Sequence, residues 1–284
     1  MAKIEDSLLL ALEALKPYLP DIVISGGWVP FVYHSYLGTT RPAHKPLGTK
    51  DVDITVSADL LPGKRPSLRE ILQNEHAEER RGGMPLGHFG PKGVEETIYE
   101  FTKDGVEVEL TFMTPRHGKD ERPAAAIPAG VVATLLRYVD VLLASTMKIR
   151  IKDQTSKGQP IDVEATFPTP EAYCYQKGLS FVDRASRDKK AKDLYYLFDL
   201  LANYPELRKR CEAEIPKLQA KFPAKGYSRF LADLDQYFKN PESEGSILVE
   251  GQRPGGGSDP AFRAKVCRTF QDFIKSLKAA QPRE

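Results

Sequence analysis

The sequence predicts a mixed α/β (α+β) domain with a mixed sheet, followed by a C-terminal α-helical bundle. Up to about residue 165, short runs with strand-like alternation are interleaved with helical patterns and glycine-rich turns. From Pro168 onward the segments are longer and have helical periodicity. We therefore expect two domains, an α/β domain over residues 1–165 and a helical domain over residues 166–284.

Length and composition fit this division. The chain has 284 residues, of which 41% are apolar and 28% charged, and its net charge is +2. That length exceeds the usual size of one hydrophobic core. The three cysteines lie far apart without a CxxC pair, which favours reduced thiols in the cytoplasm over structural zinc. Because no apolar run approaches membrane-spanning length, we expect a cytoplasmic protein that makes no membrane contact.

The first domain opens with a helix over 4–17 that stops near two prolines. A short apolar strand over 22–25 then runs into Gly26-Gly27 and an aromatic helix from Trp28 to Tyr36. The remaining predicted elements are a loop over 38–50, a strand over 51–56, a helix over 67–73, a hairpin of 94–103 and 105–112, a loop over 115–128, and a β pair of 146–153 and 159–165.

The second domain reads as five helices. A Gly/Pro/Ser-rich stretch over 241–258 is expected to be a linker between the fourth and the fifth. The expected helices are 170–181, 188–203, 205–220, 226–239 and 259–279.

Two aspartates on the strand over 51–56 are the strongest chemical signal. Asp51 and Asp53 alternate with apolar residues, so their carboxylates point to the same face. Two such carboxylates offer the hard oxygen ligands that Mg²⁺ (or Mn²⁺) prefers. A third acid on a neighbouring strand, Glu109 or alternatively Glu107, would complete a pair of metal sites roughly 4 Å apart. Two like charges on one strand face gain nothing structurally unless a cation neutralises them.

A glycine corner precedes these aspartates. Gly26 and Gly27 lie between a strand and a helix, where residues without a Cβ let backbone N–H groups approach a triphosphate closely. Gly-Gly alone is also common turn chemistry, so the corner gains its meaning from the aspartates that follow it.

Together these residues resemble the motif of the polymerase β nucleotidyltransferase superfamily. Ser25-Gly26-Gly27-Trp28 followed by Thr49-Lys50-Asp51-Val52-Asp53 is similar to its G-G/S and D-x-D motifs. Lys177 and the later stretch Lys189-Lys190-Ala191-Lys192-Asp193-Leu194-Tyr195 resemble the downstream motifs of AbiEii/MenT-type toxins of type IV toxin–antitoxin systems. The resemblance spans about residues 22–200 and implies a nucleotidyltransferase fold for the first domain.

The resemblance also implies roles for single residues. Ser25, Gly26 and Gly27 would hold the NTP, Asp51 and Asp53 would bind metal, and Glu109 is the best match for a third acid. Lys177 would contact the NTP phosphates, and Asp193 would be a further essential acid. The alternatives without a functional role are that Lys177 is a surface lysine and that Asp193 pairs with Lys189 on its own helix. In the functional reading, Asp193→Asn abolishes transfer with a nearly unchanged melting temperature.

The function expected from these residues is transfer of a nucleoside monophosphate from an NTP to an acceptor hydroxyl, with release of pyrophosphate. The family suggests RNA as acceptor, especially the 3′ end of tRNA, and a cognate antitoxin as partner. The basic run over 184–192 suits RNA phosphates, although solvated helix charge explains it equally well. Two alternatives are a small-molecule, aminoglycoside-like nucleotidyltransferase and a catalytically silent module that binds a nucleotide or a partner.

Overall fold

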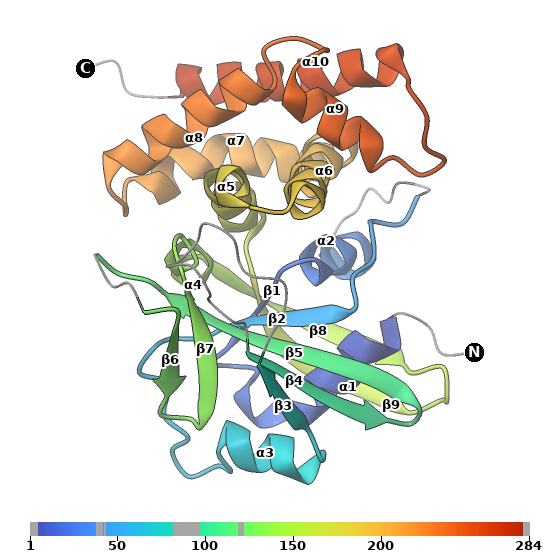
Figure 1. Ribbon diagram of the computed structural model, residues 1–284, viewed down its shortest axis with the longest axis vertical. Coiled ribbons are helices and arrows are strands. Elements are labelled where there is room, and N and C mark those ends of the chain that lie inside the picture. The colour runs from blue at the N-terminus through green and yellow to red at the C-terminus, as the bar shows by residue number, and fades with distance from the viewer. Residues whose placement is uncertain (1–4, 38–41, 43, 82–96, 119–121, 281–284) are drawn as a thin grey trace. The chain divides into compact units, whose positions relative to one another are not determined.

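The protein forms two compact units in a computed structural model that describes residues 5–37, 42, 44–81, 97–118 and 122–280. Unit 1 comprises residues 1–37 and 47–169, and unit 2 comprises residues 38–46 and 170–284. Figure 1 shows that the strands belong to the first unit and the long C-terminal helices to the second.

Unit 1 is organised around a mixed sheet, which confirms the predicted fold class. Its strands run in the order β1-β2-β5-β4-β3, and β7 pairs with β5 and with β6. The β2 and β7 strands are parallel to β5, whereas the other pairs in this sheet are antiparallel. The strands are β1 (Val23–Ser25), β2 (Asp51–Thr55), β3 (Glu78–Arg81), β4 (Thr97–Lys103), β5 (Val106–Pro115), β6 (Ala124–Ile127) and β7 (Val131–Leu136).

The hairpin between β4 and β5 turns where the sequence predicts it. Asp104 and Gly105 both have positive φ, 56° and 76°, which is the geometry of a tight two-residue turn that matches the twist of its strands. The predicted β pair near residue 157 is also present, as a separate two-stranded sheet of β8 (Thr146–Gln154) and β9 (Pro160–Pro168).

Short helices complete unit 1. Ser67 caps α3 and forms a capping box with Glu70, so the predicted start of that helix is confirmed. Buried leucines of α1 pack with Val108, Leu110 and Phe112 of β5 in one hydrophobic core, which leaves Glu107, Glu109 and Thr111 on the opposite side of β5. The helical elements are α1 (Glu5–Ala14), a 3₁₀ turn (Lys16–Tyr18), α2 (Trp28–Val32), a π-helical turn (Tyr33–Leu37), α3 (Leu68–Asn74) and α4 (Asp140–Ala144).

Four elements of unit 1 differ from the sequence prediction. The strands β3 and β7 and the helix α4 fall where the sequence shows no clear pattern. The predicted loop over 115–128 contains β6, whose alanines pair with β7. Tertiary pairing overrides the weak strand preference of alanine there. Residues 94–96 and 119–121 of the predicted segments lie outside the described residues.

Unit 2 is helical, as predicted. Phe230, Phe238, Phe270 and Phe273 are fully buried in it. Its helices are α5 (Pro170–Ser180), a 3₁₀ turn (Phe181–Asp183), α6 (Arg187–Asn203), α7 (Pro205–Gln219), α8 (Ala224–Tyr237), α9 (Glu244–Gly251) and α10 (Pro260–Ala279).

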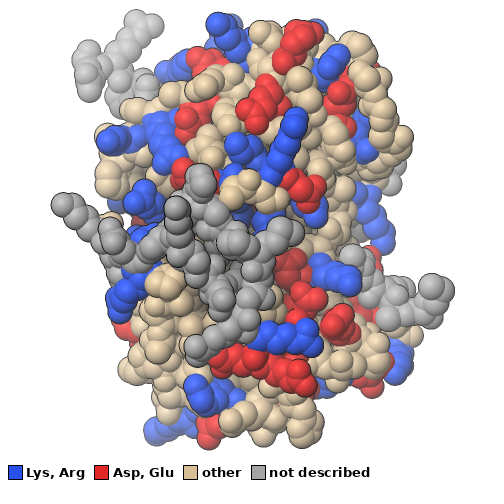
Figure 2. Space-filling model, viewed as in Figure 1, with Lys and Arg blue, Asp and Glu red and all other residues tan. Residues whose placement is uncertain are grey.

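The surface carries both charges close together. Figure 2 shows Lys and Arg side chains interspersed with Asp and Glu on the visible face, as the small net charge leads one to expect. Among the described residues, no helix has the length and the apolar character that crossing a membrane requires.

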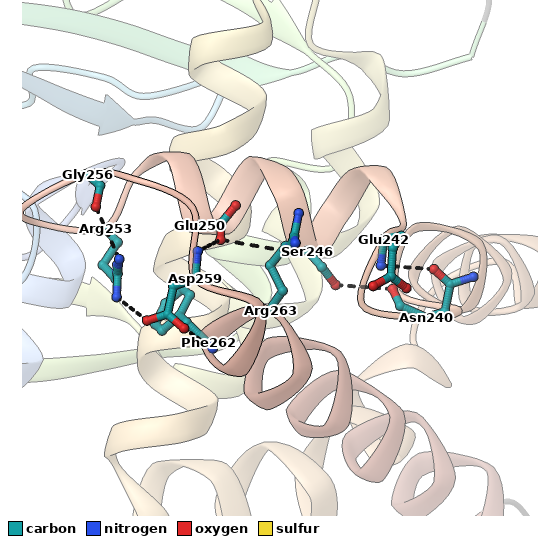
Figure 3. A network of polar contacts seen from close by, with 9 residues as sticks. All are labelled: Asn240, Glu242, Ser246, Glu250, Arg253, Gly256, Asp259, Phe262 and Arg263. Atoms are coloured by element: carbon teal, nitrogen blue, oxygen red, sulfur yellow. Dashed lines mark hydrogen bonds and ion pairs between the residues drawn. The ribbon is translucent and has the colours of Figure 1, made fainter.

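The prediction of a linker over 241–258 is wrong. This segment contains the helix α9, and polar contacts hold the glycine-rich turn that follows the helix (Figure 3). Glu250 accepts from the backbone N–H of Asp259 and lies 3.7 Å from Arg263. Asp259 in turn caps α10 and pairs with Arg253. Glycines supply the turn, while these charged side chains fix its ends.

Candidate active site

The glycine corner lies at the end of β1. Gly26 has a φ of +68°, a conformation that glycine adopts readily, and Gly27 is the N-cap residue of α2. A Cβ built on Gly26 would lie 1.8 Å from Oδ2 of Asp53. The carboxylate of Asp53 therefore occupies the space that any other side chain at this corner would fill.

Asp51 and Asp53 lie on β2 with their side chains on one face, as the alternation predicts. Both are half-buried, and Asp51 accepts a hydrogen bond from the hydroxyl of Thr49. In the β2–β5 register Asp51 is directly opposite Glu109, and Asp53 is opposite Thr111. Register partners project to the same face, so Glu109 joins the two aspartates there.

Of the two candidate third acids, Glu109 is the one beside the aspartates. Glu107 is exposed and pairs with Thr102 of β4, beyond the end of β2. Partial burial, followed by the neighbouring carboxylates of Glu100, Glu107 and Asp51, raises the pKa of Glu109, and the Lys50 ammonium opposes this. The raised pKa thus reflects burial first and the neighbouring acids second.

The acids extend across the sheet in one row. Glu100 is opposite Glu109 in the β4–β5 register, and Glu78 is opposite Glu100 in the β3–β4 register. Arg80 partly neutralises this end of the row, since it lies 2.9 Å from Glu100. Gly82 and Gly83, which follow Arg80 and Arg81 in the sequence, lie outside the described residues.

The residue types on this face suit a divalent cation. Asp51, Asp53 and Glu109 offer only carboxylate oxygens, and the Gly26 corner leaves Asp53 room that a Cβ would remove. Within the described ranges, however, no three His, Cys, Asp or Glu side chains are drawn together closely enough to hold a metal ion. The fit therefore rests on residue type, register and the Gly26 corner.

Ser25 supports the strands around this corner. Its side chain is fully buried, donates to the backbone oxygen of Asp53 at 3.1 Å, and lies 3.0 Å from the Thr55 hydroxyl. The hydroxyl is thus used between β1 and β2, and the predicted contact of Ser25 with a nucleotide would fall to its backbone.

Lys177 and Asp193 come together in unit 2. Nζ of Lys177 donates to Oδ1 of Asp193 at 2.6 Å, and Nε of Arg184 donates to Oδ2 of the same carboxylate at 2.7 Å. Both Lys177 and Asp193 are buried. The alternative of a surface lysine is therefore wrong. The pairing of Asp193 with Lys189 is also wrong, because both carboxylate oxygens bind other cations.

The ionisation of Asp193 follows from these contacts. Burial alone would raise the pKa of Asp193, but the Arg184 guanidinium and the Lys177 ammonium outweigh it, and the pKa lies below its ordinary value. Removing the charge would leave two cations in a buried setting without their anion. The expectation that Asp193→Asn leaves the melting temperature unchanged is therefore replaced by one of a large loss.

Sequence reasoning does not single out two residues that the structure places in polar clusters. Arg184 lies in the basic run over 184–192, and its residue type does not distinguish it from the other basic residues there. His44 lies in the predicted loop, and its Nε2 is 2.6 Å from Oδ1 of the buried Asp199. Asn203, four residues after Asp199 on α6, donates to the same oxygen.

Comparisons with known proteins give a family. The model of a family described as nucleotidyltransferase matches residues 5–212. Among solved structures, JHP933 from Helicobacter pylori aligns at 12% identity over 97% of this chain and 93% of that one, with a TM-score of 0.45. A second H. pylori chain aligns at 10% identity over 99% and 98%, also with a TM-score of 0.45.

A third structure is an antigenic nucleotidyltransferase-like protein from Paracoccidioides brasiliensis, with 16% identity, coverage of 81% and 94%, and a TM-score of 0.36. No curated protein sequence matches the chain. The family match includes the glycine corner, the acids of β2 and β5, and the buried ion pairs of α5 and α6. The chain belongs to the nucleotidyltransferase family.

Proposed function

We propose that the protein transfers a nucleoside monophosphate from an NTP to an acceptor hydroxyl, and that Asp51, Asp53 and Glu109 hold Mg²⁺ or Mn²⁺ for this reaction. The observation that carries the proposal is the contact between the Asp53 carboxylate and Gly26. It joins a corner suited to phosphates and a face suited to cations into one site.

Each residue of the proposed site has its own role. Gly26 and Gly27 let the triphosphate approach the backbone, and the Lys177 ammonium contacts its oxygens. Asp51 and Asp53 hold the cation, with Glu109 as the third ligand. The divalent cation, when bound, neutralises charge on the triphosphate and on the leaving pyrophosphate. Residues 1–165 are the catalytic domain in this proposal, and residues 166–284 are a helical domain.

RNA, in particular the 3′ end of tRNA, is the acceptor that we propose. Residues 170–284 carry more Lys and Arg than Asp and Glu, whereas the preceding residues carry the reverse. A local excess of positive charge in the helical half suits a polyanionic acceptor. In this proposal the protein acts in the cytoplasm as the toxin of a toxin–antitoxin pair and binds a cognate antitoxin.

A small cationic acceptor is the second candidate. The carboxylate row of Glu109, Glu100 and Glu78 continues across the sheet from Asp51. Such a row attracts a positively charged small molecule, as in an aminoglycoside-like nucleotidyltransferase, and repels nucleic-acid phosphates. This candidate predicts transfer in the absence of RNA.

The test is incubation with each α-labelled NTP and Mg²⁺, in parallel with tRNA, total RNA or aminoglycosides. We expect labelled tRNA, and a loss on the order of 10³-fold, about 4 kcal/mol of barrier, in Asp53→Ala. Asp59→Ala is the matched control, because Asp59 is exposed and lies six residues further along the chain. Label in aminoglycosides alone would favour the second candidate. No label in any acceptor would favour a silent module, and calorimetry that then detects no NTP binding would indicate one that binds a partner.

A further inference from the structure

The Asp193 carboxylate joins two cations from different parts of unit 2. Lys177 is in the last turn of α5, and Arg184 follows the 3₁₀ turn that leads toward α6. Asp193, in the second turn of α6, uses one oxygen for each of them. One carboxylate thereby holds two positive side chains, each through a different oxygen.

The Lys177 ammonium has donors to spare. An ammonium carries three N–H donors, and in the described part of the chain Asp193 is the only hydrogen-bond acceptor that reaches it. The Tyr173 ring centroid lies 5.8 Å from Nζ and adds a cation–π contact but no acceptor. The side chain is only 7% exposed, so bulk water does not easily satisfy the remaining donors. A buried ammonium in this state calls for an anionic oxygen.

Arg184 is held rigidly and faces outward. The preceding residue, Asp183, pairs with Arg229 of α8 at 2.6 Å, and Phe181 is fully buried against the Tyr237 ring. The short connection that carries Arg184 is thus held by contacts other than the one with Asp193. The Arg184 side chain is 21% exposed, which is three times the exposure of Lys177. Arg184 is the solvent-facing cation of the pair.

We propose that Lys177 and Arg184 form a paired cationic clamp for one phosphate group of the nucleotide, and that Asp193 is the positioning residue that sets the clamp. The proposal rests on the proposed NTP-dependent function and adds Arg184 to its binding residues. A guanidinium and an ammonium held by one carboxylate are arranged in advance, so little side-chain entropy is lost when the phosphate binds.

This assignment gives Asp193 a different task from that of a proton acceptor. Both of its oxygens already accept from cations, and an ionised carboxylate between two positive charges is a weak base. A proton acceptor would change kcat when removed and leave nucleotide affinity intact. A positioning residue changes nucleotide affinity, because the cations lose their geometry.

The experiment measures binding of each of the four NTPs with Mg²⁺ to the full chain by calorimetry, and steady-state KM and kcat for transfer. Arg184→Gln should weaken NTP binding about tenfold or more, equivalent to about 1.4 kcal/mol. Asp193→Asn should raise Kd and KM at least as much, and Asp193→Glu should recover part of the loss. The matched control is Arg208→Gln, since Arg208 is 26% exposed and pairs with a single carboxylate, Glu212.

The outcomes separate the clamp from the proposed function. A wild-type chain that binds no NTP would overturn the proposed function. Wild-type binding with Arg184→Gln equal to wild type would overturn the clamp alone. If Asp193→Asn does not fold, Arg184→Gln still decides. Loss of kcat with unchanged NTP affinity in Asp193→Asn would make Asp193 a proton acceptor and would also overturn the clamp.

Discussion

The carboxylates of the two units have opposite electrostatic surroundings. In unit 1, Asp51 and Glu109 lie side by side across two strands, and partial burial followed by the acidic neighbours raises the pKa of Glu109. In unit 2, Asp193 is buried between two cations, and its pKa is lowered. Among the described residues, acids therefore lie beside acids in unit 1, whereas the carboxylate in unit 2 lies between two cations.

This difference in surroundings indicates which charge a ligand of each unit would carry. Like charges on one sheet face oppose folding unless something positive joins them, and this favours a site for a cation. A carboxylate shared by two cations holds their N–H donors in a fixed arrangement, which favours an anion.

The strongest test of this comparison is to remove the anion, Asp193, from the cluster in unit 2. Asp193→Asn should lower the free energy of unfolding by about 3–5 kcal/mol, because it leaves buried cations without their partner. Since the folded-state pKa of Asp193 is lowered, its contribution is present at neutral pH and is lost as the pH falls through that pKa. Urea unfolding from pH 7 down to pH 3 measures both effects.

The control for that loss is Asp188→Asn. Asp188 is an exposed partner of Lys192 one turn away on α6, at 3.5 Å. Exposed pairs of this kind contribute about 0.3–0.5 kcal/mol. Equal losses in the two variants would show that the buried cluster is not special and would remove one side of the comparison.

A second test concerns the room that Gly26 leaves for Asp53. Gly26→Ala and Gly63→Ala both place a side chain at positive φ, +68° and +66°, but a Cβ on Gly63 meets nothing within 4 Å. Gly63→Ala should therefore cost about 1–2 kcal/mol from backbone strain alone. Gly26→Ala should cost about 1–3 kcal/mol more and should also reduce transfer, because the Asp53 carboxylate has to move. Thermal unfolding and labelled-NTP transfer measure the two costs, and equal behaviour of the variants would contradict the contact.

The smallest expected effect is a gain in stability. Because the folded-state pKa of Glu109 is raised, the folded protein loses stability as the pH rises through that pKa. Glu109→Gln should then stabilise the metal-free protein at pH 7 by about 0.2–1 kcal/mol. This gain should vanish below about pH 4, where glutamate is protonated in both states.

Added Mg²⁺ should stabilise the wild type more than Glu109→Gln, so that the wild type becomes the more stable of the two. Glu107→Gln, an exposed acid two residues away, serves as the control. A Glu109→Gln variant that is less stable than wild type at pH 7 without metal would show that the acids of this face do not repel one another.

Much of the fold follows from local patterns. Alternation around Asp51 and Asp53, the Asp104-Gly105 turn and the Ser67 capping box each fix an element through interactions a few residues apart. The strands β3 and β6 escape prediction because their residues gain strand structure from pairing with distant segments. The helix α9 is hidden by the glycines that follow it.

The candidate site is predictable only in part. Residue types and strand alternation place Asp51 and Asp53 on one face, but the choice between Glu109 and Glu107 depends on the register of β2 with β5. The burial of Lys177 and the arrival of Arg184 at Asp193 depend on how helices pack. No local pattern in a basic run shows which arginine pairs with Asp193.

The route of the chain has a consequence for anyone who wants to study the units as fragments. Residues 38–46 interrupt unit 1 in sequence, yet they belong with the helices, and His44 there contacts Asp199. A single cut near residue 165 would leave His44 in one fragment and its buried carboxylate in the other. Truncation near that boundary would expose Asp199 in the C-terminal piece, so isolated halves are poor substitutes for the intact polypeptide.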